Sequence, residues 1–430
     1  MTQHNSDINS GTKKVDVLVL GAGIVGVSVA RELQSKGRKV TLIDKVNPGL
    51  GCSYGNAGWI TPCFAMPLPQ PGMFWKSMKW MLDPESPLYI KPQPSMILFQ
   101  WLFHFMKNMN GKKMNQSIDV LTEISKDSLN FYSKLNERNP QKFDFQNKGL
   151  LMVSGTPSGV QAAHEELDLM ATRGIAGKKM SAEEIVNFEP SLRPEMIKGG
   201  VYFTGEAHAE PLDTVKTILK EFEDLGGYTQ GNTEVYDFEF EGNKIKKVLT
   251  TRGTFEADLV VFALGSWSEG IGKKLNTSIP IMGGKGYSLI VKDTSLTPGT
   301  KPLHPIMIIE RKIAVTPRKD SVRLAGTLEL VKIDFAITTR RVNAIIKGSK
   351  EYLKLPPQFE IEELWRGLRP CTPDGVPIIG FSKKWSNLFY CTGHQMLGLQ
   401  SAPGSARLAG ELIYGEKPYV DPKPFEADRF

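Results

Sequence analysis

A glycine-rich run near the start of the chain has the spacing of a phosphate-binding turn. Residues 21–26 read GAGIVG. Gly21 permits a tight turn, Gly23 lets the backbone approach a pyrophosphate, and Gly26 allows a helix to pack closely on a strand. Asp44 follows Gly26 by 18 residues, where its carboxylate can accept hydrogen bonds from both ribose hydroxyls and would repel a 2′-phosphate. The motif therefore predicts an adenosine dinucleotide without a 2′-phosphate, which is either FAD or NAD.

A second glycine-rich loop bears on the choice between these two cofactors. Residues 49–58 read GLGCSYGNAG and follow the ribose-binding acid directly. Such a loop gives the backbone a second close approach to a long ligand, whereas an NAD-binding chain normally continues into its next crossover helix. The loop therefore favours FAD.

Two later glycine loops extend the same pattern. The apolar run VVFALG ends at Gly265, and Gly393–Gly398 precedes a helical segment whose N-terminus could stabilise a developing negative charge. We expect these loops to converge on one cofactor. The residues expected to contact it are Gly21, Gly23, Ile24, Val25, Gly26, Asp44, Lys45, Cys52, Ser53, Asn56, Ala57, Gly58, Val235, Ala263, Gly265, Gly393, Met396, Leu397 and Gly398.

Alternating strand and helix patterns place these loops at the ends of strands. Val15–Leu20 (VDVLVL) predicts a buried parallel strand, Val27–Lys36 a helix, and Lys39–Ile43 a second strand. Lys246–Thr251 and Thr254–Val261 predict a hairpin that ends in a buried strand. Near the carboxyl end, Asn387–Cys391 predicts a strand and Leu399–Leu412 a long helix. Between residues 280 and 345, short strands divided by turns predict an inserted antiparallel sheet.

The composition is that of an ordinary globular protein of two or three domains. Of the 430 residues, 40% are hydrophobic and 23% charged, which excludes a disordered or fibrous chain. The 53 basic and 46 acidic residues give a net charge of +7, and because the lysines are scattered we expect no nucleic-acid partner. The four cysteines form no C-x-x-C pair, and no secretory signal is evident, which favours a reducing, cytoplasmic location. No metal site is predicted.

Two apolar segments between residues 72 and 113 suit a membrane surface. Ser95–Met106 (SMILFQWLFHFM) carries no formal charge, is too short to cross a bilayer, and is followed by three lysines. Met73–Leu82 mixes apolar and aromatic residues with lysines, as an interfacial helix does. This interpretation predicts peripheral contact with the inner face of the cytoplasmic membrane through residues 72–113. A helical insert that packs on the body of the protein is the alternative.

Five motifs together indicate a family. They are GAGIVG with Asp44, SYGNAGWI at 53–60, KGYSL at 285–289, WRGLRPCTPDGVPIIG at 365–380 and TGHQMLGLQSAPGSARLAGELI at 392–413. The set spans nearly the whole chain and resembles the FAD-dependent D-amino acid oxidase and dehydrogenase family, with the bacterial D-amino acid dehydrogenase type as its nearest match.

The resemblance implies an α/β fold, in which a Rossmann-type FAD-binding domain is interleaved with an antiparallel-sheet α+β substrate domain. We expect FAD-binding segments at 15–62, 206–278 and 361–430, the last with a C-terminal tail. Substrate-domain segments are expected at 146–205 and 279–360, and a helical insert at 63–145.

The resemblance also implies a reaction, the oxidative deamination of a D-amino acid. The substrate's Cα hydride passes to flavin N5, the imino acid hydrolyses to a 2-oxo acid, and electrons pass to a quinone. The residues after the GH pair differ from those of the better-known dehydrogenases, so D-proline or 4-hydroxy-D-proline is an alternative substrate. An oxidase of the same fold that uses O2 on an amino acid, glycine or sarcosine is a further alternative.

Three residues carry the expected substrate contacts. Arg369 suits the substrate carboxylate, because a guanidinium binds a carboxylate through two hydrogen bonds. Tyr287, in KGYSL, could add a hydrogen bond to the substrate from its phenol. His394 is expected near the flavin ring. We expect both residues to have a catalytic role. Some relatives attach the flavin through a cysteine, but the nearest position here is Gly367, so non-covalent FAD is expected.

Overall fold

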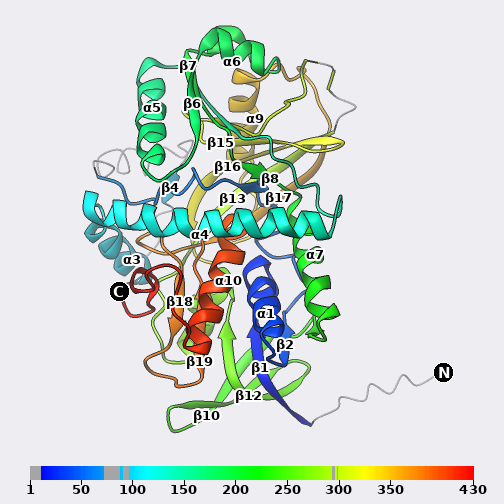
Figure 1. Ribbon diagram of the computed structural model, residues 1–430, viewed down its shortest axis with the longest axis vertical. Coiled ribbons are helices and arrows are strands. Elements are labelled where there is room, and N and C mark those ends of the chain that lie inside the picture. The colour runs from blue at the N-terminus through cyan, green and yellow to red at the C-terminus, as the bar shows by residue number, and fades with distance from the viewer. Residues whose placement is uncertain (1–10, 72–87, 91–95, 293–295, 298) are drawn as a thin grey trace, which may run out of the picture.

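The structure is a computed structural model that describes residues 11–71, 88–90, 96–292, 296–297 and 299–430. It has two large sheets, one below the other in Figure 1, with helix α4 (Gly111–Arg138) lying across the molecule between them. The predicted segment Met73–Leu82 lies outside the described residues.

The lower sheet contains the strands that the first glycine motif predicts. Its order is β10-β11-β12-β1-β2-β9, with β19 paired to β12 and β18 to β19. Strands β1, β2, β9, β12 and β19 run parallel to their neighbours at the centre, as a dinucleotide-binding sheet requires. The bounds are β1 Thr12–Leu20, β2 Val40–Ile43, β9 Tyr228–Gln230, β10 Val235–Glu241, β11 Lys244–Thr250, β12 Gly253–Phe262, β18 Ile378–Phe381 and β19 Leu388–Thr392.

Alternate residues of β1 serve the two faces of this sheet. Val17 and Val19 pack in a core with α1 (Ile24–Ser35) and α10 (Gly398–Tyr414), whereas Leu18 and Leu20 pack in a second core on the opposite face. Helices α7 (Pro211–Asp224) and α8 (Ser268–Lys274) complete the covering of the sheet. All of these β1 residues are fully buried, which explains why the run reads as continuously apolar.

The upper sheet has nine strands and is mostly antiparallel. Its order is β17-β13-β16-β15-β14-β5-β7-β6, and β4 pairs with β16. The pairs β14–β5 and β16–β4 are parallel exceptions. The bounds are β4 Leu88–Ile90, β5 Leu150–Ser154, β6 Gly177–Ser181, β7 Gly199–Phe203, β13 Met282–Lys292, β14 Ile306–Ile308, β15 Ile313–Pro317, β16 Ser321–Val331 and β17 Ile361–Cys371.

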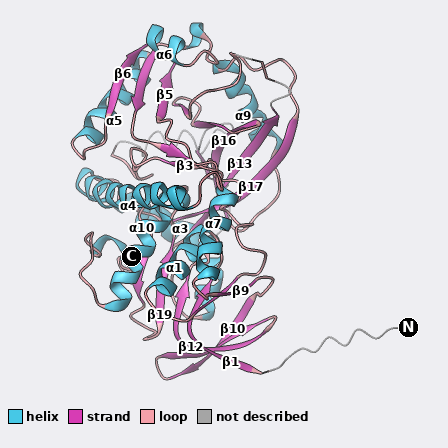
Figure 2. Ribbon diagram, turned by 45° about the vertical axis from the view of Figure 1, so that its right-hand side comes forward, coloured by secondary structure: helices cyan, strands magenta, loops and turns pink. Residues whose placement is uncertain are grey.

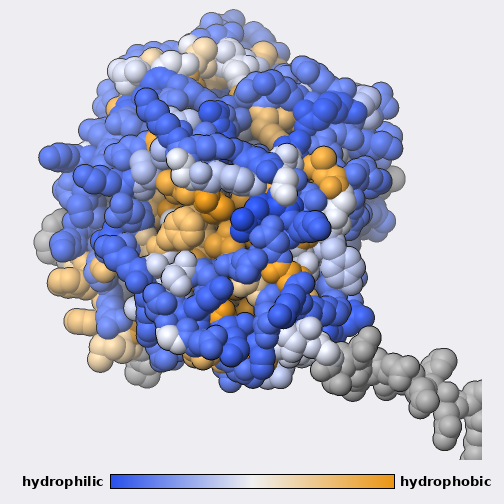
Figure 3. All heavy atoms as spheres, turned by 60° about the horizontal axis from the view of Figure 1, so that its bottom comes forward, coloured by the Kyte–Doolittle hydropathy of each residue, from blue (hydrophilic) through white to orange (hydrophobic). Residues whose placement is uncertain are grey.

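Short elements complete the structure (Figure 2). They are α3 Met96–Lys107, α5 Pro157–Ala171, α6 Ala182–Phe188, α9 Thr339–Tyr352, the two-stranded sheet of β3 Trp59–Ile60 and β8 Ala207–His208, and the 3-10 turns Pro194–Met196, Gly265–Trp267 and Lys423–Phe425. Figure 3 shows one face of the molecule, mainly hydrophilic, on which apolar residues gather at the centre.

The strands and helices predicted around the glycine loops are confirmed, including the β11–β12 hairpin and helix α10. One domain boundary differs from the expected one. The sequence predicts residues 361–371 within an FAD-binding segment, but β17 pairs with β13 along its whole length and so extends the upper sheet. The chain therefore returns to the lower sheet after Cys371 rather than at residue 361.

Candidate active site

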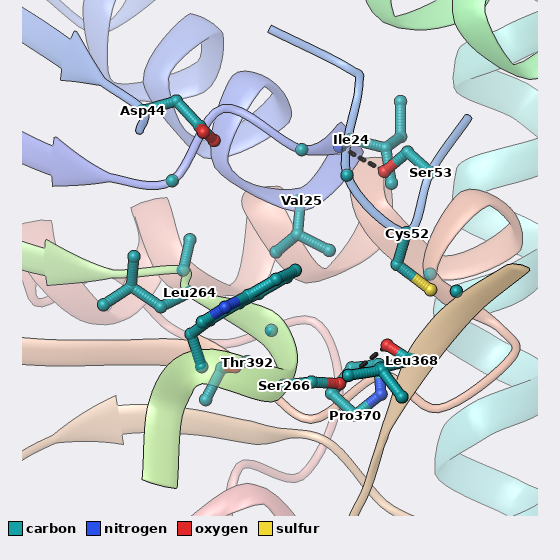
Figure 4. Close-up of a pocket in the computed structure, with 18 of the residues that line it drawn as sticks. Ile24, Val25, Asp44, Cys52, Ser53, Leu264, Ser266, Leu368, Pro370 and Thr392 are labelled. Carbon is teal, nitrogen blue, oxygen red and sulfur yellow. Dashed lines mark hydrogen bonds between the residues drawn. The ribbon is translucent and has the colours of Figure 1, made fainter. Parts of the chain in front are cut away.

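A large cavity of the described structure lies where the lower sheet presents the carboxyl ends of its strands. It has a volume of about 440 Å³ and is lined from the ends of β1, β2 and β12, from the 50–56 loop, from β17 and from the start of α10. Figure 4 shows Asp44 on one side of this cavity and Leu368 and Pro370 on another. This position is where a parallel sheet binds its ligand.

The first glycine turn has the geometry that the sequence predicts. Gly21 has a φ of +102°, and a Cβ there would lie 2.5 Å from the carbonyl oxygen of Ala263. A Cβ at Gly26 would lie 1.8 Å from the carbonyl oxygen of Gly21, so this glycine supports the turn and does not line the cavity. Gly23 caps α1, and the N–H of Ile24 donates to Ser53 Oγ at 3.0 Å.

Asp44 lies at the end of β2 with its carboxylate held by the backbone. Oδ2 accepts a hydrogen bond from Ala22 N–H at 2.7 Å, and Oδ1 accepts one from Val46 N–H at 3.0 Å. Burial raises the pKa of Asp44, and these two hydrogen bonds oppose that rise. Each oxygen keeps further acceptor capacity toward the cavity, as a ribose contact needs.

The cavity fits FAD by its shape and by its donors. Helices α1 and α10 both begin at it, since Ile24 and Gly398 line the cavity, and their N-terminal N–H groups can receive anionic groups. Glycine backbone forms much of the wall, and Gly393 has a φ of +82° at the turn before α10. A side chain at these glycines would fill the cavity or strain the turn.

Most of the predicted cofactor residues line this cavity. They are Gly21, Gly23, Ile24, Val25, Asp44, Lys45, Cys52, Ser53, Asn56, Val235, Ala263, Gly265, Gly393 and Gly398. Four other predicted residues do not line the cavity but lie next to it in the structure. Gly58 N–H donates to Asn56 Oδ1 and Met396 carbonyl accepts from Asn56 Nδ2, while the Ala57 carbonyl accepts from Thr316. Leu397 packs in a core beside the cavity.

His394 lines the cavity, and its ring is hydrogen-bonded to helix α10. The side chain is 3% exposed, and Nε2 lies 3.0 Å from Ser405 Oγ on α10. Burial lowers the pKa of His394 to about 3, so the imidazole is neutral near neutral pH. The neutral ring, hydrogen-bonded to Ser405 of α10, positions the Gly393–Gly398 loop.

Arg369 does not itself line the cavity, but it lies on β17 between two residues that do, Leu368 and Pro370, and its guanidinium interacts electrostatically with Cys52 of the lining. Its Nη1 donates to the carbonyl oxygen of Thr327 at 2.7 Å. The guanidinium lies over Gly286, where a Cβ would come within 2.1 Å of Nη1. Burial lowers the pKa of Arg369, and a half-buried guanidinium with spare donors is a binding group for an anion.

Tyr287 does not take the expected place. It is 1% exposed, does not line the cavity, and packs in the core of the upper sheet. Its hydroxyl accepts a hydrogen bond from the Thr338 N–H at 3.1 Å. Because side chains alternate along a strand, Tyr287 projects from the face opposite to the one on which Gly286 meets Arg369. The structure therefore gives no support to the substrate contact predicted for Tyr287.

Several cavity residues were missed from the sequence. Trp267, Phe335, Trp365 and Arg366 all line the cavity, and Ser266 Oγ donates to the Leu368 carbonyl at 2.6 Å. Trp267 follows the third glycine loop by two residues, which is a signal that could have found it. Phe335 comes from the connection between β16 and α9, where the sequence offers no such signal.

Comparison with known proteins identifies the family. Residues 16–412 match the FAD dependent oxidoreductase family, DAO. The chain belongs to this family. The expected oxidoreductase class and FAD cofactor are thereby confirmed. A D-amino acid dehydrogenase of Chromohalobacter salexigens is 30% identical over 423 residues, covering 97% of this chain and 100% of that protein. One of Vibrio atlanticus is 31% identical over 408 residues, covering 93% and 96%.

Solved structures share the fold of this family member. An L-proline dehydrogenase from P. horikoshii has a TM-score of 0.79 at 20% identity and covers 98% of both chains. A glycine oxidase from Geobacillus kaustophilus has a TM-score of 0.78 at 20% identity and covers 97% of this chain and 100% of its own. The expected fold class, a Rossmann-type domain combined with a second, mostly antiparallel domain, is confirmed.

Two features are absent from the part of the chain that the structure describes. In that part of the chain no three His, Cys, Asp or Glu side chains are grouped as a metal site would require. No helix within the same ranges is both long and apolar enough to cross a membrane.

Proposed function

We propose that this protein oxidises the C–N bond of a D-amino acid, giving an imino acid that hydrolyses to a 2-oxo acid. The observation that carries the proposal is Arg369, a half-buried guanidinium beside the cavity whose Nη1 donates to the Thr327 carbonyl. Its remaining donors suit a substrate carboxylate. Family membership and relatives named D-amino acid dehydrogenase support the same chemistry.

The chemistry that FAD supplies, when bound, is acceptance of a hydride equivalent at N5. This chain's own residues would bind and orient the substrate for that transfer. Arg369 fixes the carboxylate end, and a neutral His394, bonded to Ser405, keeps the turn before α10 in place. Fixed orientation of this kind lowers the barrier without a general base.

We also propose that FAD is held without a covalent bond. Gly367 lines the cavity. It stands at the position nearest to the cysteine through which some relatives attach their flavin. Cys52 lines the cavity too, but burial raises the pKa of its thiol to about 11, so the thiolate that would attack a flavin is scarce. Acid precipitation should release all the flavin into the supernatant, whereas yellow protein in the pellet would contradict this.

The substrate and acceptor are tested together. Purified holoenzyme is given D-alanine, its L-enantiomer, D-proline, 4-hydroxy-D-proline, glycine and sarcosine, each with a quinone analogue or with O2 alone. We expect 2-oxo acid from D-alanine and reduction of the quinone, with little hydrogen peroxide. Peroxide at full turnover would instead identify an oxidase, and turnover of the cyclic D-imino acids alone would identify a dehydrogenase for them.

We further propose peripheral contact with a membrane through α3. Trp101 packs inward, its Nε1 donating to the Cys371 carbonyl at 2.9 Å. The outer side of the helix exposes four large apolar side chains: Met96 (73% exposed), Phe99 (71%), Phe103 (56%) and Met106 (47%). Exposed Lys107, Lys112 and Lys113 follow, which suits anionic lipid headgroups.

Vesicle co-sedimentation tests this contact. Anionic vesicles should retain the protein more strongly than zwitterionic ones, and Phe99→Ser with Phe103→Ser should abolish the retention while amino acid oxidation persists. Equal retention of the double variant would contradict the proposal.

A further inference from the structure

The upper sheet has a β-bulge where strands β13 and β16 pair. The pairing is regular on either side of the bulge, where Tyr287 pairs with Gly326 and Lys285 pairs with Glu329. Between these pairs, Gly286 of β13 faces two residues of β16, Thr327 and Leu328. A bulge changes the direction in which local backbone groups and side chains point, and bulges are over-represented beside active sites.

The alternation of side chains identifies Thr327 as the inserted residue. A Cβ at Gly326 would lie 3.3 Å from Ile345, on one face of the sheet. Leu328 lies against Gly284, on the opposite face. Successive residues of a strand point to opposite faces, so Gly326 and Leu328 are placed as direct neighbours would be. Without Thr327 the pairing of the two strands would therefore continue unbroken.

Thr327 is unfavourable in this position for two local reasons. Its φ is +61°, a left-handed conformation that a β-branched residue rarely adopts. Its Oγ1 is buried and has no hydrogen-bond partner among the described residues, which also lowers stability. Residues held in such conformations persist where the surrounding structure enforces them, and they cluster at functional sites. The bulge therefore calls for a functional explanation.

The bulge supplies an acceptor to the guanidinium of Arg369. This side chain starts on β17, crosses β13 over Gly286 and reaches β16, where Nη1 donates to the Thr327 carbonyl at 2.7 Å. A Cβ at Gly286 would lie 2.1 Å from Nη1 and 2.5 Å from Nη2, so only glycine leaves room for the crossing. Bulge and glycine together thus fix where the guanidinium lies.

We propose that Thr327 is a positioning residue for the substrate. Its left-handed backbone aims the carbonyl at Nη1 of Arg369, and this hydrogen bond turns Nε and Nη2 toward the carboxylate of the amino acid. The inference rests on the proposed function, in which Arg369 binds that carboxylate. Thr327 acts through the guanidinium and need not touch the substrate. Without the bulge the guanidinium could take several orientations, and small misplacements of a binding group weaken catalysis strongly.

Deletion of Thr327 tests the proposal, because it removes the bulge and keeps the pairing on both sides. We expect kcat/KM for the D-amino acid to fall about 10- to 100-fold, mainly through KM. The amide of the same amino acid lacks the carboxylate, so its kcat/KM should change less than about twofold. Thr327→Gly keeps the left-handed backbone and the carbonyl, so kcat/KM for the acid should stay within about threefold of the parent value.

Gly286→Ala breaks the same contact without shortening the chain. The new Cβ would displace Nη1 from the Thr327 carbonyl, and the acid should again lose at least about tenfold in kcat/KM while the amide does not. Gly270→Ala in α8 is the matched control, because a Cβ there meets nothing within 4 Å. A parent-like ratio of acid to amide in the deletion variant or in Gly286→Ala would overturn the proposal. A loss in Thr327→Gly as large as that of the deletion would also overturn it.

Binding of propionate to the oxidised holoenzyme gives a readout that does not depend on turnover. The Kd, followed by the change in flavin absorbance, should rise at least about tenfold on deletion of Thr327. In an Arg369→Ala background the same deletion should have no further effect on the Kd, because Thr327 acts through that side chain. An equal rise in both backgrounds would overturn the proposal. If the parent binds propionate but oxidises no amino acid, the proposed function fails instead.

Discussion

Replacement of Arg369 by alanine tests the substrate site most sharply. In the described structure this guanidinium makes one hydrogen bond, from Nη1 to Thr327, so Nε and Nη2 remain for a carboxylate. A hydrogen bond to a charged group contributes about 1.5–3 kcal/mol. The variant should therefore lower kcat/KM for a D-amino acid roughly 10- to 150-fold, mainly through KM.

A substrate without its carboxylate provides the matched control. On the parent enzyme, the amide of the same D-amino acid should lose a similar factor in kcat/KM. On Arg369→Ala the acid and the amide should react almost equally, because the interacting partner is gone from both sides. Bound FAD, measured by absorbance, should be unchanged, which excludes a loss of cofactor as the cause. A change in kcat/KM under about twofold, or additive losses in the cycle, would remove Arg369 from the substrate site.

Four other substitutions test separate parts of the account. Asp44→Ala should raise the Kd of FAD about 10- to 100-fold in fluorescence titration, since a charged acceptor of ribose hydroxyls is lost; a Kd within about twofold would contradict that contact. Tyr287→Phe should leave the amino acid KM within about twofold, because the hydroxyl bonds Thr338 and not substrate. Burial raises the pKa of Glu206 to about 8, so between about pH 4.5 and 8 the folded state keeps a proton that the unfolded state has lost. The free energy of unfolding therefore falls as pH rises through this range. Glu206→Gln should raise Tm more at about pH 8 than at about pH 5, and equal gains would refute this. Burial lowers the pKa of His394 to about 3, so the unfolded state takes up a proton first and stability falls as pH drops below about 6.5; His394→Gln should flatten that loss in acid unfolding curves.

The cofactor half of the site could be predicted because its determinants are local. A turn at Gly21, a helix start at Gly23 and an acid at the end of the next strand are all encoded within a few tens of residues. The sequence assigns Gly26 both to helix packing and to cofactor contact; the clash that a Cβ there would make with Gly21 fits the packing role, and Gly26 does not line the cavity. Strands such as β1 are buried on both faces, so their apolar runs predict them directly.

The rest of the site depends on contacts between distant segments. Phe335 reaches the cavity because Lys285, 50 positions earlier, holds residues 332–338 through Asp334 and Ala336. The structure gives no support to the substrate contact expected of Tyr287 for a related reason, since strand register decides which face of β13 its ring occupies. A shift of one residue would exchange that face with the face of Gly286. The boundary at residue 361 likewise depends on the pairing of β17 with β13.

Anaerobic reduction of the bound flavin tests the central claim most directly. Holoenzyme in a sealed cuvette is mixed with D-alanine, and in a parallel cuvette with L-alanine, while the flavin absorbance is followed without any acceptor. We expect the D-amino acid to bleach the flavin within one turnover and to yield one equivalent of 2-oxo acid per flavin, and we expect no bleaching by the L-enantiomer. A flavin that no amino or imino acid bleaches would contradict the claim that this cavity oxidises a C–N bond.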